Sequence, residues 1–179
     1  EALDALYEDG FLPYSGESRS DVHNLYYMAR SARVDLPSFS PTSENRRIKK
    51  KFDGKHLVSK EYSASAFIKN GDMLNFCLKY FETRHGQNFI TKERLIRILS
   101  HSPEAKVVEY KDAEGVSRAY IIEVHGDNMR HYWFSFYDLS MVYQSFGMWL
   151  MIDRVDDAKK KGLKYCYLGT VYGDKALYK

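Results

Sequence analysis

Three runs rich in β-branched and aromatic residues dominate the middle of the chain. They cover residues 106–111, 116–125 and 129–138, and two short polar segments, 112–115 and 126–128, separate them. Val, Ile, Tyr and Phe between turn-forming residues are typical of strands joined by tight connections. The pattern predicts an antiparallel meander of three strands.

Apolar residues at helical spacing flank this meander. Before it, one helix is expected between an N-cap at Asp72 and a stop at Gly86, and a second begins after Thr91. After it, a longer helix is expected to end with Gly162 at its C-cap and to expose Asp153 and Asp156. Its apolar stripe consists of Met148, Met151, Ile152, Val155 and Ala158.

A further strand at 165–169 follows this helix. A strand, helix, strand unit closes with a right-handed crossover and parallel strands, so we expect a mixed sheet and an α/β (α+β mixed sheet) fold class. The N-terminal third is less regular. It predicts short strands at 25–28 and 33–36 and a helix from Ser43, capped by Thr42 or Ser43.

Length and composition favour one compact domain without a membrane partner. The chain has 179 residues, of which 44% are hydrophobic, and it contains neither a run of about 20 apolar residues nor a signal-peptide pattern at its start. We expect a cytoplasmic protein. Cys77 and Cys166 are isolated within apolar segments, and the six histidines lack metal-ligand spacing, so we expect no metal site and treat these residues as core or surface.

Basic residues gather at one place although the formal net charge is only +3. Such a local patch attracts phosphate, and the alternative is a solvated helix face. The cluster consists of Arg46, Arg47, Lys49, Lys50, Lys51 and Lys55.

The unit from Arg130 to Tyr172 has the layout of the core of GNAT acyltransferases, in which the donor enters between the two splayed strands. A coenzyme A donor favours a glycine-rich turn at the helix start, whose free amides bind pyrophosphate. The segment 144–149 has one glycine, and Phe146, Met148 and Trp149 add bulk to it. We expect a poor pyrophosphate site here, although a weak Gln-x-x-Gly pattern is present.

Two stretches together resemble arginyl- and leucyl-tRNA-protein transferases. The first holds Ser15-Gly16, Tyr27, the Arg33-Val34-Asp35-Leu36 strand, the Phe39-Ser40-Pro41 turn and Arg46-Arg47. The second holds Phe136-Tyr137-Asp138, Ser145-Phe146-Gly147, Tyr167-Leu168-Gly169 and a Tyr178-Lys179 ending. The order of these pieces, across most of the chain, is more specific than any one of them.

The resemblance implies an aminoacyltransferase that moves arginine or leucine from aminoacyl-tRNA to the N-terminal α-amino group of an acceptor protein with an acidic N-terminus. It implies no cofactor besides the tRNA co-substrate. It divides the chain into a tRNA- or acceptor-binding N-terminal subdomain, 1–60, and a GNAT-like domain, 61–179. The binding residues that it implies are Arg33, Arg46, Arg47, Lys50, Gln144, Ser145, Gly147, Tyr167, Gly169, Tyr178 and Lys179.

One departure from the family pattern concerns metal binding. Family members carry a cysteine-rich segment before the Arg-hydrophobic strand, whereas residues 28–32 here contain no cysteine. We therefore expect a divergent member without a zinc or iron-sulfur centre.

The catalytic candidates follow from the reaction. An aminoacyl ester is already reactive, so the protein must align the amine, accept its proton and stabilise an oxyanion. Asp138, at a strand end, is the candidate base with Tyr137 beside it, and the alternative role for Asp138 is a turn cap. Two other functions remain open: an acetyl-CoA-dependent N-acetyltransferase, and a relative that binds tRNA or protein N-termini without turnover.

Overall fold

The computed structural model describes residues 2–16, 24–87, 90–100 and 102–179. The α-helices are α1 (Ala2–Glu8), α2 (Ser43–Lys50), α3 (Ala64–Ile68), α4 (Gly71–His85), α5 (Lys92–Ser100) and α6 (Phe146–Lys160). The strands are β1 (Phe11–Pro13), β2 (Tyr26–Met28), β3 (Ser31–Asp35), β4 (Val58–Ser63), β5 (Ala105–Lys111), β6 (Ser117–His125), β7 (Met129–Tyr137) and β8 (Tyr165–Thr170). Short 3-10 helices lie at η1 (Asp53–Lys55), η2 (Leu139–Gln144) and η3 (Asp174–Ala176).

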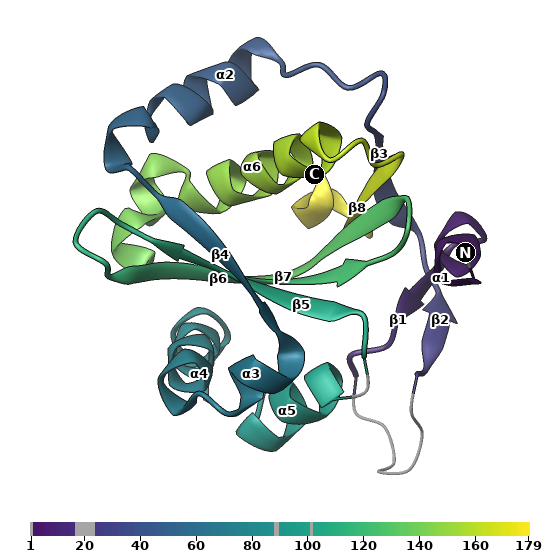
Figure 1. The fold of residues 1–179 in the computed structure, drawn as a ribbon, viewed down its shortest axis with the longest axis horizontal. Coiled ribbons are helices and arrows are strands. Elements are labelled where there is room, and N and C mark those ends of the chain that lie inside the picture. The colour runs from purple at the N-terminus through teal and green to yellow at the C-terminus, as the bar shows by residue number, and fades with distance from the viewer. Residues whose placement is uncertain (1, 17–23, 88–89, 101) are drawn as a thin grey trace.

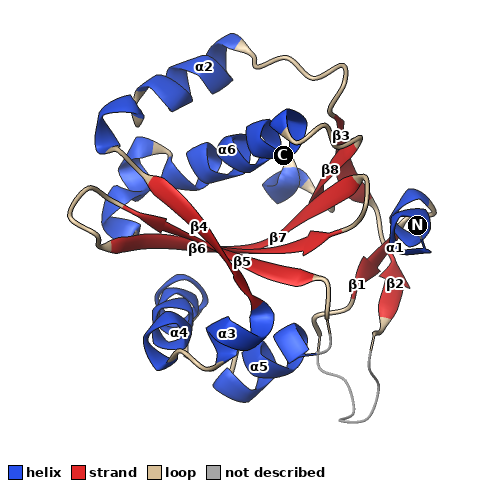
Figure 2. Cartoon of the chain, in the orientation of Figure 1, coloured by secondary structure: helices blue, strands red, loops and turns tan. Residues whose placement is uncertain are grey.

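The main sheet has six strands in the order β3-β8-β7-β6-β5-β4 (Figure 2). The predicted meander is confirmed, because β5, β6 and β7 pair antiparallel in sequence order. The predicted crossover is also confirmed: α6 connects β7 to β8, and these two strands are parallel. The expectation of a mixed α/β sheet is therefore correct.

Helices cover both faces of this sheet (Figure 1). The helices α6 and α2 lie on one face, and α3, α4 and α5 lie on the other. The helix α1 and the hairpin β1-β2 lie beside the sheet near β8 and the start of β7. Strands β3 and β4 both come from the N-terminal third and form opposite edges of the sheet, so the boundary expected at residue 60 falls within β4.

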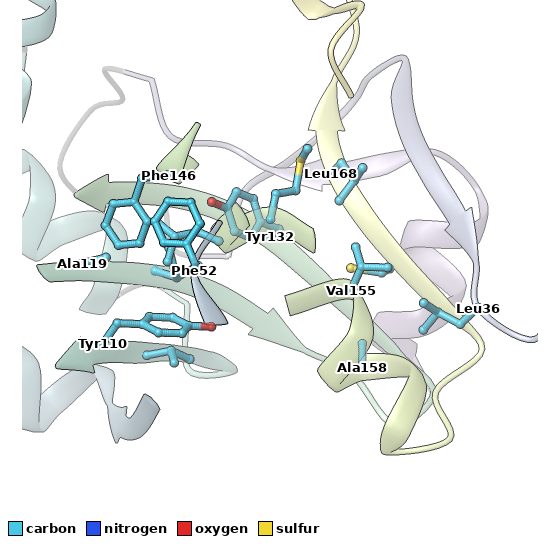
Figure 3. Close-up of a cluster of buried hydrophobic side chains, with 14 residues drawn as sticks. Leu36, Phe52, Tyr110, Ala119, Tyr132, Phe146, Val155, Ala158 and Leu168 are labelled. Atoms are coloured by element: carbon cyan, nitrogen blue, oxygen red, sulfur yellow. The ribbon is translucent and has the colours of Figure 1, made fainter. Parts of the chain in front are cut away.

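An aromatic cluster fixes α6 to the sheet and to the segment after α2 (Figure 3). The ring of Phe52 stacks on that of Phe146 with centroids 5.3 Å apart, and Trp149 lies 5.3 Å from Phe52. Phe146 is fully buried at the start of α6. Aromatic pairs of this kind stabilise a core beyond the area they bury. The start of α6 is therefore held rigidly against the sheet.

The helix ends agree with the sequence in part. Thr42 caps α2 in a capping box with Asn45, and the Thr91 hydroxyl accepts a bond from the Arg94 amide as predicted. The Asp72 prediction was wrong: the side chain of Asn70 caps α4 by accepting from the amides of Asp72 and Met73. Asn and Asp cap equally well, so composition did not distinguish them.

Two expectations about α6 need correction. Its C-cap is Lys161, and Gly162 follows with φ +75°, the left-handed conformation that glycine adopts after a helix. Asp153 and Asp156 are half-buried rather than exposed, because Asp153 accepts a bond from the Tyr110 hydroxyl and Asp156 pairs with Lys49 of α2.

A buried ion network lies between α6 and the sheet. Glu123 of β6 is fully buried and accepts two bonds from Arg154 of α6, at 2.8 and 3.1 Å. Arg130 of β7 lies 3.3 Å from the same carboxylate and also pairs with Asp157. Burial raises the pKa of Glu123, but the hydrogen bonds from His125 and Arg154 lower it by more, so the net pKa lies below the ordinary value. One carboxylate thus joins β6, β7 and α6.

Replacing Glu123 with Gln should destabilise the fold by about 3 kcal/mol, since two buried arginines lose the carboxylate that they share and keep, among the described residues, only Asp157 as a counter-charge. The native pKa of Glu123 is lowered, so its stabilisation is present above the ordinary value of 4.5 and is lost as the pH falls through the native value. Urea unfolding should therefore show a difference in the free energy of unfolding between wild type and variant near pH 7, and this difference should become smaller in acid. Glu44→Gln, at an exposed ion pair, is the control and should leave the midpoint unchanged. No difference in the free energy of unfolding, or a difference that does not change with pH, would contradict a stabilising role for ionised Glu123.

Candidate functional site

Strands β7 and β8 pair only at their beginnings. The pairs are Met129 with Tyr165, Arg130 with Cys166 and His131 with Tyr167. Beyond them β7 continues to Tyr137 and β8 to Thr170 without pairing with each other. We call this divergence, from the His131–Tyr167 pair onward, the strand fork. It is the splay between parallel strands that the sequence predicted.

Gly169 shapes the β8 side of the fork. Its φ of +78° lies in the left-handed region, and the pairing of β8 with β3 shifts register beside it, between Ser31 and Arg33. The Ser31 hydroxyl donates to the Gly169 carbonyl at 3.1 Å. A Cβ atom at Gly169 would lie 3.5 Å from Lys179 Nζ and 3.6 Å from His131 Nε2. The glycine therefore leaves space at the point where the Lys179 ammonium and the His131 imidazole nitrogen converge.

His131 is buried at the fork with only 1% of its surface exposed. Its Nδ1 atom is hydrogen-bonded to the Tyr7 hydroxyl at 2.9 Å, whereas Nε2 has no hydrogen-bond partner among the described residues. Burial, and then the charge of Lys179, lower the pKa of His131 to about 3. The imidazole is therefore neutral near pH 7.

Lys179 reaches the fork because the chain after β8 turns back. Its amide donates to the Ala176 carbonyl at 3.1 Å, which closes a turn after η3. Its ammonium donates to the Thr170 carbonyl at 2.7 Å, and burial lowers its pKa. An ammonium has three N–H donors, so this bond leaves two of them available.

Tyr137, Gly147 and Tyr178 lie close to one another. A Cβ atom at Gly147 would lie 2.9 Å from the Tyr137 hydroxyl, so the start of α6 approaches this ring as closely as glycine allows. The Tyr137 ring also packs 5.1 Å from Tyr80. Tyr178 is 60% exposed, and burial of part of its ring and then the neighbouring Tyr137 raise its pKa. Tyr178 thus offers an open aromatic face next to Lys179.

The start of α6 corrects one argument from the sequence. Phe146 and Trp149 pack into the core against Phe52, so their bulk does not cover the helix start. Ser145 precedes the helix with φ +63°, and its side chain makes no capping bond. The bulk of these residues is therefore no argument against an anion at this position. Gln144 ends η2, and its side chain lies outside the described part of the structure.

Asp138 follows the last residue of β7 and is heavily bonded. It accepts from the Ser140 amide at 2.9 Å, from the Ser140 hydroxyl at 2.7 Å and from Arg118 Nη1 at 2.7 Å. Burial raises the pKa of Asp138, but the bonds from Ser140 and Arg118 lower it to a net value below the ordinary one. A carboxylate in this setting is a weak base. Its geometry is that of a turn cap.

The remaining predicted residues lie elsewhere. Arg46, Arg47 and Lys50 are exposed on α2, where Arg47 donates two bonds of 2.6 Å to Glu44. Arg33 is exposed on the edge strand β3 with its guanidinium 4.1 Å from the Tyr165 ring centroid, and Tyr167 is buried beside it. The structure thus divides the candidates among the fork, where Tyr167 also lies, the exposed face of α2, and Arg33 on the edge strand β3.

Sequence reasoning missed His131 and Tyr7. Alternation along β7 places His131 on the same face as Met129 and Trp133. A polar residue on this apolar face was therefore the one sequence signal that pointed to His131. Tyr7 lies far from it in sequence and gave no signal. The interpretation of Cys77 and Cys166 as packing residues is confirmed, since both are free and buried.

Two searches of the described residues found nothing. No group of three or more His, Cys, Asp or Glu side chains in this part of the chain is arranged to hold a metal ion. None of the described helices has the length and apolar character of a membrane span.

Comparison with known proteins supplies relatives by sequence. No family model matches the chain. A protein of Dinoroseobacter shibae named aspartate/glutamate leucyltransferase is 26% identical over 154 residues, which cover 78% of this chain and 52% of the relative. The protein of the same name from Maricaulis maris is 25% identical over 171 residues, covering 93% of this chain and 65% of the relative. The chain therefore spans 52–65% of the length of these two relatives.

Solved structures agree on the fold. FemX superimposes with a TM-score of 0.63 at 9% identity, over 97% of this chain and 60% of FemX. L-PGS from Bacillus licheniformis superimposes with a TM-score of 0.60 at 15% identity, over 97% of this chain and 51% of L-PGS. At such low identity these likenesses show the fold alone, and they confirm the expected GNAT-like acyltransferase architecture. By sequence the chain is thus similar to the two aspartate/glutamate leucyltransferases, and by fold it is similar to FemX and L-PGS.

Proposed function

We propose that this chain transfers leucine from leucyl-tRNA to the N-terminal α-amino group of an acceptor protein whose first residue is Asp or Glu. The names of the curated relatives, aspartate/glutamate leucyltransferase, support both choices. They favour leucine over the arginine that the sequence left open. The structural observation that carries the proposal is the strand fork, where β7 and β8 diverge around His131, Gly169 and Lys179.

The chemistry that the fork must support is aminolysis of an ester. Most of the rate gain in such a reaction comes from alignment and from fixed dipoles, so strong bases are not required. Tyr178, exposed beside the fork, offers a face on which the terminal adenine of the tRNA stacks, which contributes roughly 1–3 kcal/mol per base. Lys179 and Tyr137 lie next to that face.

Acetyl-CoA-dependent N-acetylation is the second candidate. The observation that favours it is the uncapped start of α6 at Ser145, since free amides at a helix start bind phosphate groups. The names of the relatives favour transfer of a leucyl group over transfer of an acetyl group. The donor is therefore the variable that an experiment must test.

The direct test incubates the protein with radiolabelled leucyl-tRNA, arginyl-tRNA or acetyl-CoA and with peptides that begin with Asp, Glu or Ala. We expect label from leucyl-tRNA to appear on the Asp and Glu peptides and not on the Ala peptide or an N-terminally acetylated Asp peptide. Mass spectrometry then locates leucine on the α-amino group. Label from acetyl-CoA alone would support the second candidate, and tRNA binding without transfer would support a non-catalytic relative.

Asp138→Asn separates a base from a cap at the end of β7. Asn caps nearly as well as Asp, so a cap predicts single-turnover rates close to wild type. A general base predicts a loss of about 10²–10⁴ in the chemical step with tRNA affinity intact. Because Asp138 is bonded to Ser140 and Arg118, we expect the first result. A loss of about 100-fold in a folded Asn variant would restore Asp138 as the base.

The exposed cations of α2 are proposed to bind the tRNA backbone. Replacing Arg46 and Arg47 with Ala should weaken tRNA binding and flatten its dependence on salt, since each lost phosphate contact removes about one released counterion. The matched control replaces Lys69 and Lys92, which are exposed near α3 and α5 on the other face of the sheet. Equal salt slopes for both double variants would assign Arg46 and Arg47 to the acceptor or to plain surface.

A further inference from the structure

An unsatisfied nitrogen lies at the strand fork. His131 Nε2 is buried and has no hydrogen-bond partner among the described residues. Leaving a buried polar atom unpaired destabilises a fold, and native proteins have few such atoms. An apolar side chain in the same place would avoid this cost. The imidazole therefore points to a ligand that supplies the missing partner.

The contact with Tyr7 indicates which nitrogen of His131 carries the hydrogen. Tyr7 is 1% exposed, and burial raises the pKa of its phenol above the ordinary value, so the hydroxyl keeps its hydrogen. The hydrogen-bond partner of this hydroxyl among the described residues is His131 Nδ1, 2.9 Å away, so we assign Nδ1 as the acceptor of the hydrogen. A neutral imidazole that accepts at Nδ1 carries its hydrogen at Nε2. The free nitrogen is thus a donor, and its ligand must be an acceptor.

A second donor converges on the same place. Lys179 Nζ and His131 Nε2 lie 3.5 and 3.6 Å from the position that a Cβ atom would take at residue 169. Glycine leaves that position open. Lys179 has donors to spare beyond its bond to Thr170. One oxygen atom bound there contacts a neutral N–H and an ammonium together.

The charge state of His131 suits donation rather than proton removal. The titratable groups whose charges act on His131 are Lys179 and Glu123. The ring of Tyr7 packs against the imidazole, and the ring of Tyr167 packs against Tyr7. With a pKa of about 3 the imidazole is a very weak base near neutral pH. It remains a fixed hydrogen-bond donor through the whole range in which an acceptor amine is nucleophilic.

We propose that His131 Nε2–H, aligned by Tyr7, and the Lys179 ammonium bind the carbonyl oxygen of the aminoacyl ester as it becomes an oxyanion. The assignment rests on the proposed function. The acceptor amine nitrogen attacks the ester carbonyl carbon, a C–N bond forms, and the π electron pair moves to the oxygen held between the two donors. Collapse restores the C=O bond and breaks the C–O bond to the tRNA ribose. The ribose oxygen takes up the proton that the amine loses, which leaves a peptide bond and deacylated tRNA.

The kinetic test uses the full chain in single-turnover transfer. His131→Phe and Lys179→Gln should each lower the rate of the chemical step by about 10²–10³, the usual loss for one oxyanion donor, with tRNA affinity unchanged. His131→Gln, which restores an N–H donor, should recover part of the rate. The matched control is Lys164→Gln. Lys164 is exposed just before β8 and pairs with Glu8, so this variant should react as wild type. Tyr7 is a positioning residue, so Tyr7→Phe should slow wild type but not the His131→Phe variant.

A binding test is independent of turnover. A tetrahedral phosphonate analogue of 3′-leucyl-adenosine carries the charge of the oxyanion, and the 3′-leucylamido analogue is planar and neutral. Wild type should prefer the phosphonate, and His131→Phe should abolish that preference while planar binding is retained. If wild type transfers leucine and the His131 variants transfer it at the same rate, the assignment of His131 and Lys179 as oxyanion donors is wrong, and the proposed function still holds. A wild type that transfers no aminoacyl group would overturn the proposed function and this assignment together.

Discussion

The geometry of the site depends on one buried carboxylate. Glu123 binds Arg154 of α6 and lies against Arg130 of β7, and Arg130 occupies the second of the three residue pairs that join β7 to β8. The position of α6 and the place where the two strands diverge are thus set by the same charge. Buried ion pairs are costly to desolvate and add little net stability, but the loss of one partner leaves a buried charge poorly compensated and is strongly destabilising. We infer that this network specifies where the fork begins.

Neighbouring residues of β7 then serve opposite faces of the sheet. Arg130 takes part in the ion network under α6, and His131, the next residue, packs on the other face with Tyr7 and Tyr167. Period-two alternation in a strand produces this division directly. Gly169 and the turn that brings back Lys179 complete the site from β8. The fork therefore joins residues from the two ends of the chain, Tyr7 and Lys179, around a strand from its middle.

Much of the fold could be predicted from the sequence, because strand alternation and helical spacing are local signals. The meander of β5, β6 and β7 and the parallel crossover through α6 are examples. Tyr137, Gly169 and Lys179 were predicted as site residues from the family resemblance, and the structure brings Gly169 and Lys179 together beside His131. His131, Glu123 and Arg154 were not found, because their roles depend on partners distant in sequence, such as Tyr7. Asn70 replaced Asp72 as a cap for a simpler reason, since both residues suit that position.

We propose that aminoacyl transfer takes place at the strand fork. A crystal structure of the full chain with a non-hydrolysable 3′-leucylamido-adenosine tests it most directly. We expect the leucyl carbonyl oxygen to lie within hydrogen-bond distance of His131 Nε2 and Lys179 Nζ, and the adenine to lie against Tyr178. A ligand bound away from the fork, for example in the cavity of about 300 Å³ between Phe76, Tyr80 and Leu139, would contradict it.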